Sequence, residues 1–311
     1  MVANSKRWVD DLVLCLYLPV VIVVGASISI PLWDWANAAG GDIAHELTRK
    51  GPARFTRRIT MVLAFLLLPL ALRALRWEGW RDSGWQHAAG ISAARRDGLT
   101  GLIHGLIIMT ILFATALIIG TRIWHISVTG GELALSTFTF LIGALVVGIL
   151  EETIARGILF RLLIQRWRPI SVIVIVSIVF AWLHFLAAEP TAYEAGPYLQ
   201  RVSNVLVSSS TGFLRIPHAM VEMTNLALFS ALLSLMYLKS GSIWLAAGFH
   251  AGVVYIKRLN GIVADSVKDH EQALFLGVSS DFTDGWFCAI LLSLLIIWFI
   301  RKQKALSIHA A

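Results

Sequence analysis

The chain has 311 residues, of which 57% are hydrophobic and 14% are charged, and its mean hydropathy is +0.75. This composition excludes a soluble domain and predicts an all-α, polytopic membrane protein. The formal net charge of +7 lies mostly outside the apolar runs, as expected for loops that face anionic headgroups, and it does not indicate nucleic-acid binding. Cys15 and Cys288 both fall in apolar runs and are expected to be packed thiols.

Apolar segments that are long enough to cross a bilayer, at about 20 residues each, predict about eight transmembrane helices. In chain order they cover residues 10–33, 59–77, 99–127, 133–165, 169–188, 220–238, 243–256 and 286–300. The first segment is longer than the apolar core of a signal peptide, so we expect it to be retained. The basic segment 42–58 is expected to be either interfacial or a solvated loop.

Residues 189–217 form a different kind of segment, because three prolines, a run of serines and a glycine are expected to interrupt any long helix. They are Pro190, Pro197, Pro217, Ser208, Ser209, Ser210 and Gly212. A connection of this length is commonly a lid, a binding loop or disordered. We therefore expect it to gate or bind the ligand of the protein.

Three charged residues lie within two helical turns inside the apolar run of residues 133–165: Glu151, Glu152 and Arg156. Charge at this depth is costly, so it usually marks function. Glu152 and Arg156 are four residues apart with the acid first, which favours an ion pair. Glu151 points about 100° away and is predicted to be free for another partner. The alternative is a purely structural buried triad.

Two of the nine histidines, His184 and His250, lie well inside predicted spans. At 1.5 Å per residue, Glu151, His184 and His250 lie about 22, 24 and 16 Å from a basic residue at one membrane face. These basic residues are Arg166, Arg168 and Lys239, respectively. We therefore expect these three side chains to converge. A carboxylate and histidines in a partly dry cavity can activate water. The chain contains no His-Glu-x-x-His. It also contains no Gly-x-Ser-x-Gly and no phosphate-binding loop, so a serine hydrolase and a nucleotide-driven pump lose support as interpretations.

Three segments resemble the motifs of the CAAX protease and bacteriocin-processing (CPBP, or Abi) family of intramembrane endopeptidases, over about residues 141–259. They are Glu151-Glu152-x-x-x-Arg156, Phe180-x-x-x-His184 and Gly241-Ser-Ile-Trp-Leu-Ala-Ala-Gly-Phe-His250. The resemblance implies hydrolysis of a membrane-associated or lipidated protein or peptide, in what we expect to be a prokaryotic cytoplasmic membrane. It implies that Glu151 and His184 activate water, that Glu152 and Arg156 support them, and that His250 stabilises the oxyanion.

The chain departs from the family pattern at Val254, where the third motif usually carries an asparagine. Asn225 on the sixth span is one candidate for the missing oxyanion donor. Phe180 of the second motif is a further candidate for contact with the substrate or the oxyanion. Asn225 is equally suited to hydrogen bonding between helices.

The predicted organisation is N-terminal helices with basic loops over residues 1–132, a catalytic core over residues 133–260, and a last loop and helix over residues 261–311. Both termini are expected to be cytoplasmic, from the distribution of Lys and Arg. We expect no metal cofactor. Two alternatives stay open: a zinc metalloprotease with a His₂Glu site formed by Glu151, His184 and His250, and an inert family member that acts as an immunity or scaffold protein. The sequence does not indicate an oligomeric state.

Overall fold

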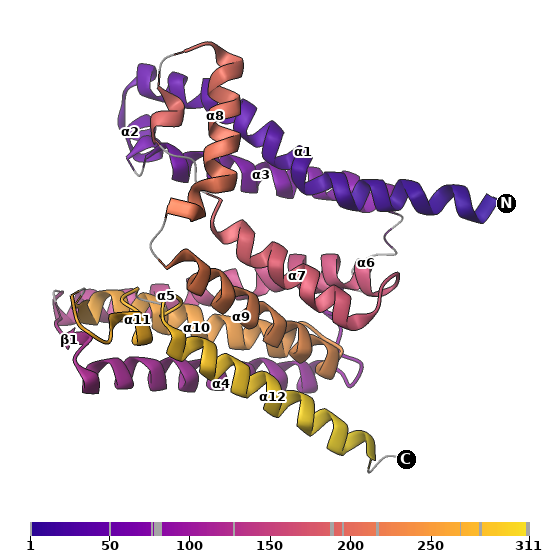
Figure 1. Cartoon of the computed structure of the whole chain (residues 1–311), viewed down its shortest axis with the longest axis vertical. Coiled ribbons are helices and arrows are strands. Elements are labelled where there is room, and N and C mark those ends of the chain that lie inside the picture. Colours follow the sequence, from indigo (N-terminus) through magenta and orange to yellow (C-terminus); the bar gives the residue numbers. More distant parts are fainter. Residues whose placement is uncertain are drawn as a thin grey trace. The chain divides into compact units, whose positions relative to one another are not determined.

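The computed structural model describes residues 2–49, 51–75, 77, 83–126, 128–186, 190–194, 196–215, 218–267, 269–279 and 282–308. These residues are overwhelmingly helical, and they form two compact units (Figure 1). Five of the described helices are long and apolar enough to cross a membrane. The prediction of an all-α, polytopic membrane protein is therefore confirmed.

The first unit comprises residues Met1–Glu78 and Leu183–Pro217. Its elements are α1 (Val2–Ala39), α2 (Asp42–Thr48), α3 (Pro52–Ala74), η3 (Pro190–Tyr193), α8 (Tyr198–Thr211) and η4 (Gly212–Arg215). Gly51, at a φ of 81°, and Pro52 begin α3, a pairing that suits a helix N-terminus. Helix α1 packs along α3 and also contacts α8, and Arg201 on α8 forms a two-pronged ion pair with Asp34 on α1.

The second unit comprises residues Gly79–Trp182 and His218–Ala311. Its elements are α4 (Ile91–Ile119), β1 (Arg122–Trp124), α5 (Gly130–Glu152), the π-helix η2 (Thr153–Phe160), α6 (Arg161–Ile164), α7 (Pro169–His184), α9 (Ala219–Ser240), α10 (Trp244–Val263), β2 (Ala264–Ser266), α11 (Ala273–Leu276) and α12 (Trp286–Ile308). The two strands pair antiparallel, with Ile123 opposite Asp265. The last two residues of α7 fall in the first unit.

Helix α10 is the centre of the second unit, because it packs against α4, α5 and α9 (Figure 1). Its approach to α4 depends on glycine. A Cβ atom on Gly105 of α4 would lie 2.3 Å from the carbonyl oxygen of Phe249, and one on Gly248 of α10 would lie 2.0 Å from that of Gly98. No side chain larger than a hydrogen atom fits at these positions, so the two backbones are in direct contact.

Each of the eight predicted membrane segments contains a described helix, but five of these helices are long and apolar enough to span, and the third segment ends in β1. The number of eight membrane spans stays a prediction. The basic segment that we expected to be interfacial or a solvated loop forms α2 and the first turns of α3, so it is not a loop. Its interfacial position stays a prediction. The seventh predicted segment is longer than expected and reaches Val263. Helices α4 and α12 pack against α10 and α9 of the predicted core, respectively. The predicted division at residues 132 and 260 stays a prediction.

The expectation that prolines and Gly212 interrupt any long helix in residues 189–217 was wrong. Helix α8 covers 14 residues of this segment. Pro197 directly precedes α8 and Gly212 directly follows it, so these residues delimit the helix instead of breaking it.

Candidate active site

The first predicted motif lies where α5 changes into a π-helix. A capping box formed by Thr129 and Glu132 begins α5, and the helix then continues through η2 to Ile164. The loop before α4 holds the π-helix in place: Trp85 Nε1 donates to Thr153 Oγ1 over 3.1 Å, and Gly157 lets the carbonyl of Ser83 approach closely. Short π-helical segments inside α-helices often occur at functional sites.

Glu152 and Arg156 form the predicted ion pair, and both side chains are fully buried. Arg156 Nη1 donates to Glu152 Oε1 over 2.9 Å. Nη2 donates to the carbonyl oxygen of Ser230 over 2.7 Å and to Ser230 Oγ over 2.6 Å. Ser230 lies on α9 and is itself fully buried. The guanidinium therefore joins the π-helix to α9 while it neutralises one of the two carboxylates.

The same oxygen of Glu152 also meets His250 on α10, at 2.9 Å from Nδ1. A carboxylate can only accept a hydrogen bond, so Nδ1 carries the proton and donates it to Glu152. This bond fixes the orientation of the ring, and the His250 side chain is 5% exposed. The other ring nitrogen, Nε2, is consequently directed away from Glu152.

Glu151 lies on the free side of the His250 ring. Its Oε2 atom is 3.8 Å from His250 Nε2, which is too long for a direct hydrogen bond. The Glu151 side chain is 36% exposed, whereas Glu152 and Arg156 are 0% exposed. Glu151 is thus the charged group of this cluster that a ligand can reach.

Aromatic rings enclose the cluster. The Phe180 ring of α7 lies 5.2 Å from the Arg156 guanidinium carbon, and its centroid is 6.3 Å from that of His250. Phe229 of α9 stands edge-to-face to His250 at 5.2 Å. These rings exclude water from the Arg156 side and so strengthen the electrostatic interactions there.

Of the predicted site residues, the structure brings Glu151, Glu152, Arg156, Phe180 and His250 together. His184 is the last residue of α7 and has an exposed side chain. It belongs to the first unit, whereas the other five belong to the second. Val254 is half-buried, one turn beyond His250 on α10.

Asn225 is fully buried on α9, and its amide nitrogen donates to the carbonyl oxygens of Thr283 and Gly285 over 2.7 and 2.9 Å. Both amide hydrogens are thereby used to attach α9 to the loop that precedes α12. This arrangement favours the helix-packing alternative for Asn225 over the role of oxyanion donor.

Sequence reasoning did not identify Ser230 and Phe229 as parts of this cluster. Ser230 could have been noticed as a polar residue inside an apolar span, where serine commonly bonds to another helix. Phe229 carries no such signal, because a phenylalanine in an apolar run is normally a packing residue. Among the described residues, no three His, Cys, Asp or Glu side chains come together as potential metal ligands.

Residues 132–256 match the family model of type II CAAX prenyl endopeptidases, described as Rce1-like, a family of peptide hydrolases. The matched segment contains all three motifs, so the family resemblance indicated by the sequence is confirmed. No curated protein and no solved structure matches the chain.

Proposed function

We propose that this protein is an intramembrane endopeptidase that hydrolyses a peptide bond of a membrane-associated or lipidated protein, with Glu151 as the general base. One observation carries the proposal: Glu151 is the accessible carboxylate of a buried charged cluster, and it lies 3.8 Å from a histidine whose other nitrogen is fixed. The match of residues 132–256 to a family of peptide hydrolases supplies the reaction class.

The geometry suggests how water is activated. A water oxygen at about 2.8 Å from both Glu151 Oε2 and His250 Nε2 fits beside their 3.8 Å separation. Glu151 takes a proton from this water as the oxygen attacks the peptide carbonyl carbon. His250 holds the water and, when Nε2 carries a proton, donates to the developing oxyanion. We also assign His184 to water activation, together with Glu151. This assignment rests on the family resemblance alone.

The energetic cost of the cluster supports a functional role. Within the described part of the chain, Glu152 Oε2 and Arg156 Nε are buried without a hydrogen-bond partner. A partly satisfied buried network destabilises a protein relative to apolar packing of the same volume. The intact pair of Glu152 and Arg156 therefore stabilises the fold no more than apolar side chains of the same volume would, and we assign the pair the role of orienting His250.

The proposal is tested by cleavage of lipidated and membrane-anchored model peptides in liposomes that contain the purified protein. Glu151→Gln keeps the size of the side chain and one hydrogen-bond-accepting oxygen but removes the base, so turnover is expected to fall to background while the thermal unfolding temperature stays unchanged. Glu271→Gln is the matched control, because Glu271 is exposed on the loop before α11.

Full activity of Glu151→Gln would refute the assignment of the base. If the wild-type protein cleaves none of the peptides, the alternative of an inert immunity or scaffold protein becomes the better interpretation. In that case the cluster of Glu152, Arg156 and His250 is retained for structure alone.

A further inference from the structure

Apart from the site described above, the second unit contains a cleft of about 410 Å³ between α4, α5 and α10. Apolar side chains form most of its wall, including Leu99 and Leu102 of α4 and Leu145 and Ile149 of α5. Arg95 also lines the cleft. A cation at the edge of an apolar cleft in a membrane protein suits a ligand that has an anionic headgroup and an apolar chain.

The charge lies at one end of the cleft. Helix α4 has 29 residues and is about 44 Å long, whereas the hydrocarbon core is about 30 Å thick. Arg95 is in the second turn of α4, so it lies near the level of the headgroups. Leu99 and Leu102 are one and two turns deeper. Trp244 also lines the cleft; it packs edge-to-face on Trp85 and donates to its carbonyl oxygen, as residues of an interfacial aromatic belt do.

The side chain of Arg95 makes no hydrogen bond or ion pair in the part of the chain that the structure describes. The neighbouring acid does not neutralise it: Asp97 lies 3.2 Å from His87 Nε2 and 3.8 Å from Arg96 Nε. The cleft therefore combines one uncompensated positive charge at headgroup level with apolar walls that extend deeper along α4.

We propose that this cleft is a binding site for an anionic phospholipid, with the phosphate at Arg95 and one acyl chain between α4 and α5. Basic groups at the ends of clefts between membrane helices bind such headgroups through the same chemistry. This inference does not depend on the proposed peptidase activity.

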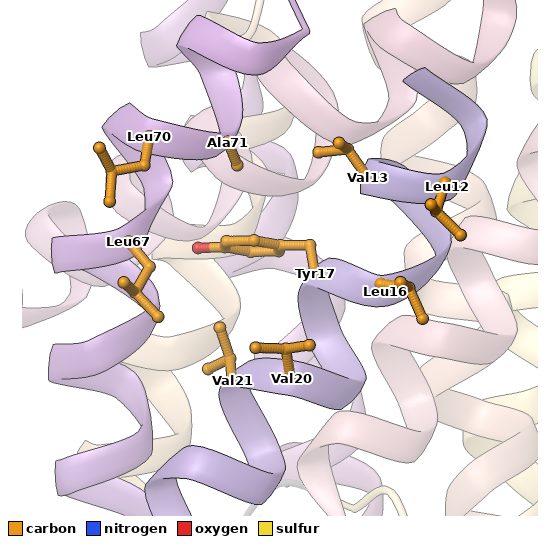
Figure 2. A pocket seen from close by; sticks show the side chains of 9 residues that line it. All are labelled: Leu12, Val13, Leu16, Tyr17, Val20, Val21, Leu67, Leu70 and Ala71. Atoms are coloured by element: carbon orange, nitrogen blue, oxygen red, sulfur yellow. The ribbon is translucent and has the colours of Figure 1, made fainter. Parts of the chain in front are cut away.

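A second cleft, of about 290 Å³ between α1 and α3, shows why charge matters for this assignment. Its lining is apolar apart from Tyr17, which points from α1 toward α3 and donates to the carbonyl oxygen of Ala64 (Figure 2). Nothing in this cleft distinguishes one lipid from another, so we assign it no particular ligand.

The test is native mass spectrometry of the full chain released from nanodiscs that contain equal amounts of phosphatidylglycerol and phosphatidylcholine. The wild-type protein is expected to retain phosphatidylglycerol preferentially. Arg95→Gln is expected to lower that preference by about fivefold, the equivalent of about 1 kcal/mol for one charge near the membrane surface. Arg96→Gln is the matched control, since Arg96 is the adjacent arginine of α4 and is absent from the lining of the cleft.

A third variant tests the acyl-chain part of the site. A Cβ atom on Gly98 would meet only the carbonyl oxygen of Trp244, at 3.9 Å, so Gly98→Leu is expected to occupy the cleft and reduce retention of both lipids. Equal losses in Arg95→Gln and Arg96→Gln would show a diffuse surface effect and overturn the proposal. Unchanged retention in a folded Gly98→Leu protein would also overturn it.

Discussion

The most direct test of the buried cluster is the replacement of Arg156 by alanine. In the structure this change removes the hydrogen bonds to Glu152 Oε1 and to the carbonyl and hydroxyl oxygens of Ser230. Glu152 is 0% exposed, so its carboxylate would remain buried with His250 as its one hydrogen-bond partner among the described residues. Leaving one member of a buried ion pair without its partner costs about 3–5 kcal/mol.

The loss of stability in Arg156→Ala is measured as the change in the free energy of unfolding, by SDS titration of the detergent-solubilised protein. Peptide cleavage is measured on the same samples. Arg156→Ala is expected to lose about 3–5 kcal/mol of stability and most of its activity, because His250 is no longer held by a fixed carboxylate. Arg168→Ala is the matched control, since Arg168 is exposed just beyond α6, and it should change stability by less than about 0.5 kcal/mol.

The double variant Arg156→Ala with Glu152→Gln shows whether the buried carboxylate causes the loss of stability. Glu152→Gln removes the buried charge but keeps an oxygen that can accept from His250 Nδ1. If an uncompensated carboxylate causes the loss in Arg156→Ala, then adding Glu152→Gln should recover part of the stability, giving a non-additive cycle. A double variant that is less stable than Arg156→Ala would refute the reasoning, because the loss would then come from packing around the guanidinium.

Two further predictions concern the chemistry and the packing of the second unit. We expect cleavage to survive chelation; one tightly bound zinc per chain, with activity lost to a chelator and restored by zinc, would establish the metalloprotease alternative. Gly105→Ala would place a Cβ atom 2.3 Å from the carbonyl oxygen of Phe249 and is expected to lower stability by about 1–3 kcal/mol. Gly130→Ala, where a Cβ atom meets nothing within 4 Å, should leave thermal unfolding unchanged; equal effects of the two substitutions would contradict the close approach of α4 and α10.

The sequence predicted two features of the site: an ion pair within one helix, and a contact between residues at similar depth in the membrane. The ion pair of Glu152 and Arg156 follows from a four-residue spacing, which places both side chains on one face of a helix. The meeting of Glu151 with His250 follows from their depths, because antiparallel helices of known length bring residues of similar depth to the same level.

The hydrogen bond between His250 and Glu152 could not be predicted in this way. It depends on the rotation of α10 about its own axis, which is decided by packing against α4 and not by the depth of His250 in the membrane. The glycine pairs Gly101-x-x-x-Gly105 and Gly248-x-x-x-Gly252 carry that information, since small residues four apart mark close helix contacts. Helix α8 was missed for a different reason: proline and glycine were read as helix breakers where they are helix ends.

The glycine contacts also explain how a polar site is held precisely inside an apolar protein. Helix α10 packs closely between α4 and α5. A Cβ atom on Gly148 of α5 would lie 2.7 Å from the carbonyl oxygen of Ala247 on α10. A Cβ atom on Gly248 of α10 would lie 2.0 Å from the carbonyl oxygen of Gly98 on α4. Backbones in contact on two sides leave α10 little freedom to slide. A shift of one residue, about 1.5 Å along the axis, would break the 2.9 Å bond from His250 to Glu152. The orientation of His250 toward Glu151 is therefore set by residues without side chains as much as by the charged residues themselves.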